Sequence, residues 1–132
     1  MNASARSVSA QSSVNLSAPR VWLGLEGATL LLVSTGAFFT LGGHWPLFVL
    51  LLLAPDIAML GYLLGKRSGA HVYNLFHSTL LPAALLAFGF FAAQPLAVSV
   101  ALIWFAHIGL DRAIGYGLKY EGGFKDTHLN RV

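Results

Sequence analysis

The chain contains no cysteine and few charged residues, and each of these features excludes a class of protein. Without cysteine there is neither a disulfide framework nor a thiolate metal site. Charged residues make up 10% of the 132 positions, whereas a soluble domain carries roughly a quarter. With 56% hydrophobic residues and a mean hydropathy of +0.69, the chain lacks the polar surface that a soluble globule needs. Composition therefore predicts an integral membrane protein.

The net charge of +3 does not indicate a nucleic-acid partner. A membrane protein carries an excess of Lys and Arg at the cytoplasmic ends of its spans, and this excess is sufficient to explain the charge. Residues 1–20, MNASARSVSAQSSVNLSAPR, are rich in Ser and Ala and show no apolar periodicity. We predict that they form a disordered N-terminal tail. An organelle transit peptide has a similar composition and is the alternative for this segment.

Four apolar stretches follow the tail, and each is close to the roughly 20 residues that span a bilayer. They cover about 21–41, 46–65, 70–93 and 95–116, and the short polar turns LGGHWP, GKRSG and AQP separate them. Turns this short make neighbouring helices antiparallel. The predicted fold is therefore all-α: an up-down bundle of four transmembrane helices over residues 21–116, followed by a C-terminal segment at 117–132.

The positions of Lys and Arg predict the orientation of this bundle. They lie before the first span, between the second and third, and at or beyond the end of the fourth. The loops LGGHWP and AQP contain neither residue. The positive-inside rule therefore places both termini in the cytoplasm, and the spans are in contact with membrane lipid. The sequence does not indicate an oligomeric state.

Each predicted helix also carries an ionisable residue, and all of these lie in the cytoplasmic half of the spans. Asp56 follows Pro55 within the apolar run FVLLLLAPDIAMLGYLLG. An isolated carboxylate in hydrocarbon costs several kcal/mol, so it is normally paired, protonated or bound to a cation. His107 and Asp111 share one face of the fourth helix at spacing i, i+4.

His77, in the third helix, shares a face with Asn74 at spacing i, i+3. Two carboxylates and two imidazoles at one depth are a plausible site for a divalent ion such as Zn²⁺, Mn²⁺ or Mg²⁺. The predicted ligands are Asp56, His77, His107 and Asp111. Glu26, about a turn and a half into the first helix, is the candidate general base.

The C-terminal segment offers further polar residues that could reach this site. FKDTH supplies Lys125, Asp126 and His128 after two glycines, and the preceding GYGLKY has the aromatic and small residues of a segment at the membrane surface. Folded over the cytoplasmic mouth, Asp126 and His128 would reach a ligand or a substrate headgroup. Lys119 or Lys125 would hold a phosphate. Asn74 completes the predicted substrate-binding set.

The order LLAPDIAML, HVYNLFHSTLLP and AHIGLDRAIGYGLKY resembles the uncharacterised bacterial membrane family called domain of unknown function 4260. The closing GYGLKYEGGFKDTHL is the most specific part of this resemblance, which covers about 22–132. It implies a location in the bacterial inner membrane.

More distantly, the pattern is similar to the YdjM-like inner-membrane metal-dependent hydrolases. The resemblance carries over to Pro55 with Asp56, His77 with Ser78, and His107 with Asp111. The chain departs from that pattern at Ala58 and Met59, where the hydrolases have an Asp and a His, and keeps only His71 of their His-Arg pair.

Three functions are open at this point. The first is a metal-dependent hydrolase of a lipid or another small amphiphile, in which the metal activates water and Glu26 is the base. The second is a small transporter or proton-coupled carrier that uses the same residues as a proton relay. The third is a haem or quinone protein with His77 and His107 as axial ligands, which leaves the acids unexplained.

Overall fold

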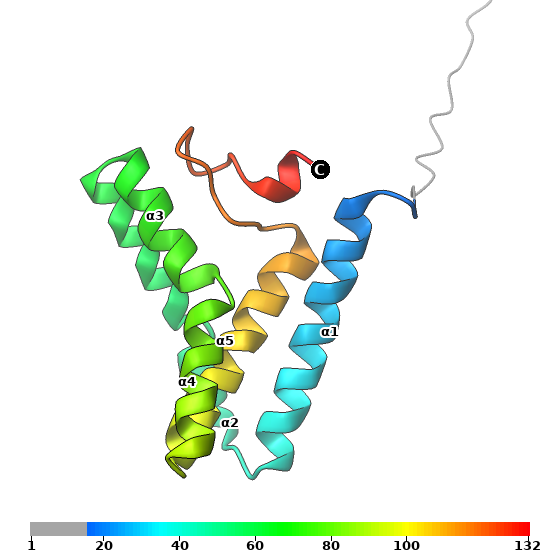
Figure 1. The fold of residues 1–132 in the computed structure, drawn as a ribbon, viewed down its shortest axis with the longest axis vertical. Helices are drawn as coiled ribbons and strands as arrows, with labels where there is room; N and C mark the ends of the chain where they lie inside the picture. The colour runs from blue at the N-terminus through cyan, green and yellow to red at the C-terminus, as the bar shows by residue number, and fades with distance from the viewer. Residues whose placement is uncertain (1–15) are drawn as a thin grey trace, which may run out of the picture.

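The computed structural model describes residues 16–132, so most of the predicted tail lies outside the described residues. The described chain is helical apart from its turns and C-terminal segment (Figure 1). Its elements are α1 (Pro19–Thr40), α2 (Trp45–Leu52), η1 (Ala54–Leu64), α3 (Lys66–His77), α4 (Leu80–Phe91), α5 (Pro95–Ile114) and η2 (His128–Asn130). Proline occupies one of the first two positions of α1, α2, η1 and α5, where its missing N–H costs nothing.

These elements form four units that are long and apolar enough to cross a membrane, as predicted. They are Pro19–Thr40, Trp45–Leu64, Lys66–Phe91 and Pro95–Ile114. Large apolar side chains point outward from them, for example Leu50 at 74% and Phe91 at 85% exposure. Such a surface suits hydrocarbon rather than water. The all-helical fold with four candidate spans is therefore confirmed, while the cytoplasmic location of the termini stays a prediction.

The second and third spans are each broken by a proline. Pro55 cannot donate to the carbonyl four residues earlier, and the chain continues as the 3₁₀ helix η1, in which the Asp56 N–H bonds Leu53 O at 3.1 Å. In the third span Pro82 cannot donate to Ser78, whose backbone is extended, so α3 ends at His77 and α4 begins at Leu80. Such breaks within a span are tolerated where the irregular backbone is buried in protein or lines a cavity.

Helix α5 is the centre of the fold, with α1 along one side and α2 and α4 along the other (Figure 1). Gly27 of α1 and Gly109 of α5 allow the closest approach, because a Cβ at either would collide with the facing helix. Near the opposite end, Phe38, Leu102 and Ile103 form a buried apolar cluster. Helix α3 packs mainly against η1, and the α3–η1 pair diverges from α1 at one end of the molecule.

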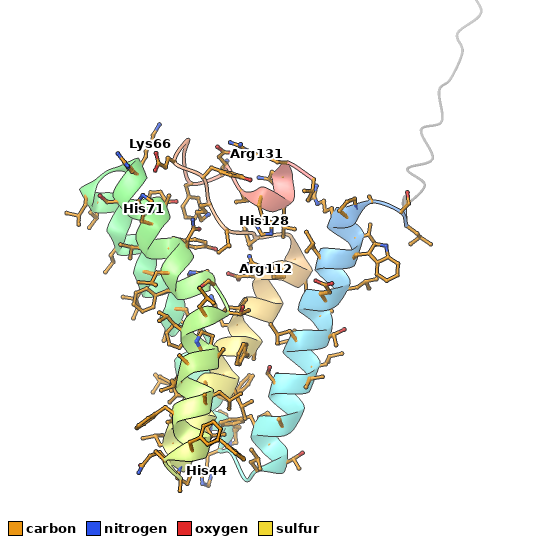
Figure 2. The ribbon with its side chains drawn as sticks, viewed as in Figure 1. His44, Lys66, His71, Arg112, His128 and Arg131 are labelled. Carbon is orange, nitrogen blue, oxygen red and sulfur yellow. The ribbon has the colours of Figure 1, made fainter. Side chains whose placement is uncertain are left out.

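The C-terminal segment, residues 115–132, crosses this open end (Figure 1). Gly115 ends α5 in the left-handed conformation, and the chain then returns over α5 toward α3. An isolated antiparallel bridge between Lys119 and Thr127 closes the segment on itself. Figure 2 shows Lys66, His71, Arg112, His128 and Arg131 toward this end and His44 at the opposite one, the asymmetry on which the topology prediction depends.

Candidate metal centre

Two helix breaks and one helix turn bring the four predicted ligands together. Asp56 lies in the first turn of η1, His77 is the last residue of α3, and His107 and Asp111 lie one turn apart on α5. One ligand atom from each residue lies within 4.8 Å of the ligand atoms of the other three. Both imidazoles are 1% exposed, the Asp111 side chain is 13% exposed and that of Asp56 is 38% exposed. The four residues therefore lie close together in the structure, as expected.

The Nε2 atoms of the two histidines lie close to each other and to both carboxylates. His77 Nε2 lies 3.1 Å from His107 Nε2, 3.2 Å from Asp56 Oδ1 and 3.6 Å from Asp111 Oδ2. His107 Nε2 lies 3.3 Å from Asp56 Oδ1 and 3.4 Å from Asp111 Oδ2. All five of these distances, each of which involves a histidine Nε2, fall between 3.1 and 3.6 Å.

The orientation of His77 is fixed by contacts outside the cluster. Its Nδ1 is 2.9 Å from the carbonyl oxygen of Tyr73, which can only accept, so Nδ1 carries the proton and donates it. Its Nε2 is then free to present a lone pair to the cluster when the ring is neutral. The Tyr73 ring stacks on the imidazole with centroids 3.7 Å apart, and Arg112 Nη2 donates to the His77 carbonyl at 3.1 Å.

A cavity of about 230 Å³ lies next to the cluster, on the side that the C-terminal segment covers. Its lining combines the two carboxylates of the cluster with residues of that segment: Asp56, Met59, Tyr73, Asp111, Tyr116, Lys119 and Phe124. Lys119 is 4% exposed, and its Nζ donates to the carbonyl of Phe124. Burial lowers the pKa of Lys119, and the charges of Asp111 and Asp56 partly oppose that shift.

Asn74 and Lys119 hold the C-terminal segment on α3. Asn74 Nδ2 donates to the Lys119 carbonyl at 2.7 Å, and the Lys119 N–H donates to Asn74 Oδ1 at 2.6 Å. Glu121 adds contacts to Arg67 and His71 of α3, each at 3.3 Å. The sequence left open whether this segment covers the cluster; in the structure it does, with Lys119 in the cavity and Asn74 bonded to its backbone.

The other three residues of the predicted substrate-binding set lie outside the cavity, and two of them, Asp126 and His128, have side-chain partners within the segment itself. Asp126 forms a two-bond ion pair with Arg131 at 2.7 and 3.0 Å, and Lys125 is exposed. His128 Nδ1 accepts from the Leu118 N–H at 2.8 Å. Burial and the nearby Arg112 charge lower the pKa of His128. None of the three lines the cavity described above.

Glu26 is also apart from the four ligands. Its side chain is exposed on α1, where it lines a surface hollow with Trp22, Thr29 and Val33. It is not in the group of ligand atoms that lie within 4.8 Å of one another. The structure gives Glu26 no contact with the cluster that would let it take a proton there.

Sequence reasoning missed two residues that shape the cluster. Tyr73 contributes its carbonyl and ring to His77, and its hydroxyl lies 3.5 Å from Asp111 Oδ2. Arg112 uses one guanidinium nitrogen on the His77 carbonyl and another on the Tyr116 carbonyl. The spacing offered a signal for Tyr73, since it stands four residues before His77, where a helical carbonyl faces the later side chain. The contact of Arg112 with the His77 carbonyl had no comparable signal, because the two residues are 35 positions apart.

Fold and site together define a helical membrane protein of four candidate spans with a buried His/Asp cluster that could hold a metal. The chain belongs to the family called domain of unknown function 4260, whose model matches residues 20–132. No curated protein and no solved structure matches the chain. The distant similarity to YdjM-like hydrolases is not shown by these comparisons.

Proposed function

We propose that the protein binds a divalent metal ion, Zn²⁺ in preference to Mg²⁺, through Asp56, His77, His107 and Asp111. The observation that carries the proposal is the spacing of the ligand atoms. Ligands about 2.0–2.1 Å from a tetrahedral Zn²⁺ lie about 3.3–3.4 Å from one another. The five distances that involve a histidine nitrogen, 3.1–3.6 Å, match edges of such a tetrahedron. One oxygen of each carboxylate lies within 4.8 Å of one oxygen of the other. Mg²⁺ prefers an octahedral shell of oxygens, whereas two imidazoles with two carboxylates suit zinc.

Charge supports the same proposal. Two carboxylates that face each other at membrane depth repel, because the low dielectric screens them little. A divalent ion neutralises both, and neutral histidines complete its shell without adding charge. The hydrogen bond from His77 Nδ1 to Tyr73 is the outer contact that metal-bound histidines usually make, since it fixes the tautomer.

We further propose that the site hydrolyses a lipid or another small amphiphile. A bound divalent ion lowers the pKa of water and polarises the oxygen of a scissile bond. Asp56 is the most exposed of the four ligands and lines the cavity. It is therefore the residue that can release the ion, admit water and accept its proton. This role replaces the one predicted for Glu26, which lies elsewhere on α1.

The alternatives have less support. A proton relay across the membrane needs polar groups on both sides of the cluster. The second cavity beside the cluster does not provide such groups, because its lining is apolar: Leu51, Ala54, Pro55, Phe76, Val100 and Trp104. Haem ligation is disfavoured because the two Nε2 atoms, 3.1 Å apart, leave no room for an iron and its porphyrin between them.

Metal analysis of the detergent-purified protein tests the proposal. We expect about one zinc per chain in the wild type, little in His107→Ala and a reduced content in Asp56→Asn, which keeps the shape of the side chain. Asp126→Asn is the matched control, because Asp126 pairs with Arg131 outside the cluster. Chelator-sensitive release of fatty acid or phosphate from bilayer lipid, lost in His107→Ala, would test hydrolysis. A wild type without zinc, or equal zinc in all variants, contradicts the metal site.

A further inference from the structure

Lys119 is a buried cation without a carboxylate partner. Among the described residues, no Asp or Glu oxygen lies within 4.0 Å of its Nζ, which instead lies 4.4 Å from the Tyr73 ring centroid and 3.5 Å from that of Phe124. Only one of its three N–H donors is used, on the Phe124 carbonyl. A charged group as buried as this is normally paired.

The charges around the cavity indicate what the missing partner is. The carboxylates of Asp56 and Asp111 offset the two charges of a bound divalent ion, and Lys119 then leaves the cavity with one excess positive charge. Arg112 adds a further positive charge nearby, but its guanidinium is directed at two backbone carbonyls and does not line the cavity. An anion beside Lys119 restores neutrality, and phosphate has enough oxygens to meet both the ammonium group and the metal.

The apolar cavity beside the cluster is placed to hold the rest of such a ligand. It has a volume of about 180 Å³, and its lining includes Pro55 and Phe76, the residues directly before Asp56 and His77. Trp104, one turn before His107, closes another side and donates to the Phe76 carbonyl at 2.7 Å. The residues of the cluster and their immediate neighbours thus line two cavities, one with a buried cation and one that is apolar.

We infer that the substrate class is an amphiphile with a phosphate headgroup. The phosphate lies in the cavity between the metal and Lys119 Nζ, and its hydrocarbon chain lies in the apolar cavity along Val100 and Trp104. This inference rests on the proposed metal site and names the substrate for it. It selects Lys119 over Lys125 as the phosphate-binding lysine, because Lys125 is exposed and outside the cavity.

Calorimetric titration of the zinc-loaded protein in neutral detergent, with inorganic phosphate and with hexyl phosphate, tests the inference. We expect hexyl phosphate to bind more tightly than inorganic phosphate. Lys119→Met should weaken both by at least about tenfold at unchanged zinc content, because a charged hydrogen bond is lost. Lys125→Met is the matched control and should bind as the wild type does. Lys119→Arg, which keeps the positive charge and the backbone hydrogen bonds to Asn74, should retain most of the phosphate binding.

A substitution in the apolar cavity distinguishes a site for a phosphate-bearing amphiphile from a site for free phosphate. Val100→Phe fills the space for the chain, so it should weaken hexyl phosphate and leave inorganic phosphate unchanged. If Val100→Phe affects neither ligand, the amphiphile is wrong and the site binds free phosphate. If Lys119→Met binds both ligands normally with zinc retained, the inference is overturned while the metal site stands.

A wild type that holds no zinc is a different outcome, because the proposed function then fails first. The same titrations on the zinc-free protein decide the inference in that case. Binding that Lys119→Met abolishes supports an anion site independent of metal. The absence of binding overturns the inference together with the metal site.

Discussion

At the scale of single residues, Tyr73 explains why His77 can serve as a ligand without moving. The Tyr73 carbonyl takes the Nδ1 proton, and its ring stacks on the imidazole at 3.7 Å. A ligand already in its bound tautomer and rotamer loses little freedom when the ion binds. Asp56 is held less tightly, with its side chain 38% exposed toward the cavity. This difference fits a site with one movable ligand.

Removing the ion should destabilise the wild type but not His107→Ala. Chelation leaves the carboxylates of Asp56 and Asp111 facing each other, and a ligand at 100 times its Kd contributes about 2.7 kcal/mol to stability. We expect chelator to lower the Tm of the wild type by about 5–20 °C, since each kcal/mol shifts Tm by about 2–8 °C in domains of this size range. His107→Ala should change little, because it has already lost a ligand. Thermal scans in detergent measure both, and an equal shift in the two proteins contradicts the account.

At the scale of elements, the crossing of α1 and α5 depends on glycine at the contact. A Cβ at Gly109 would overlap the backbone of Leu31, whereas a Cβ at Gly36 would meet nothing within 4 Å. Close approach of helices through small residues is a common way to pack helices in a bilayer. The two glycines therefore make a matched pair, one at the crossing and one on the open surface of the same helix pair.

Gly109→Ala should destabilise the protein, and Gly36→Ala should not. Overpacking costs typically 1–3 kcal/mol, while alanine at an open helical position gains up to about 1 kcal/mol over glycine. Denaturant or thermal unfolding of the two variants in one detergent measures the difference. Similar stability of the two variants would show that α1 and α5 do not cross at Gly109.

The C-terminal segment should loosen as the pH falls. The pKa of His128 is lowered in the folded protein, so the unfolded segment takes up a proton first, and stability is lost as pH falls below the ordinary value of 6.5. Protonation also removes the acceptor for the Leu118 N–H. Above that pH the docking is intact. His71 contacts Glu121 of the same segment, so His71→Gln is the background in which His128 is compared.

Hydrogen exchange of residues 115–132 at pH 8 and pH 5.5 measures this effect. In the His71→Gln background we expect faster exchange at the lower pH, after correction for the intrinsic rate. His128→Gln in the same background should lose most of that pH dependence. Protection that is independent of pH in both proteins would contradict the role of His128.

At the scale of the whole molecule, the four apolar spans and the common level of the four ligands could be predicted from the sequence, because both follow from hydropathy and helical rise. The direction in which Glu26 faces could not be predicted, because the apolar residues of α1 are spread around the helix and their pattern does not specify a packed face. The roles of Asp126 and His128 depend on Arg131 and Leu118 within a tight turn of the chain. Local hydrogen bonds of this kind leave no periodic signal in a sequence.

The orientation of the molecule in the membrane is a prediction of the same kind. Basic residues gather toward the end that holds the C-terminal segment, and the opposite loops have no Lys or Arg (Figure 2). We expect a phosphatase reporter fused after Val132 to be inactive and a cytoplasmic fluorescent reporter there to be active. A periplasmic signal from that fusion would place the cluster on the outer side.

X-ray absorption at the zinc edge of the purified protein reports which atoms bind the ion, and it is therefore the decisive measurement for the metal site. The account predicts four nitrogen or oxygen ligands at about 2.0–2.1 Å, two of them imidazoles. The imidazole contribution should fall by half in His77→Ala that retains some metal. A shell of six oxygens without imidazole, or a spectrum unchanged in that variant, would contradict the claim that Asp56, His77, His107 and Asp111 form a metal site.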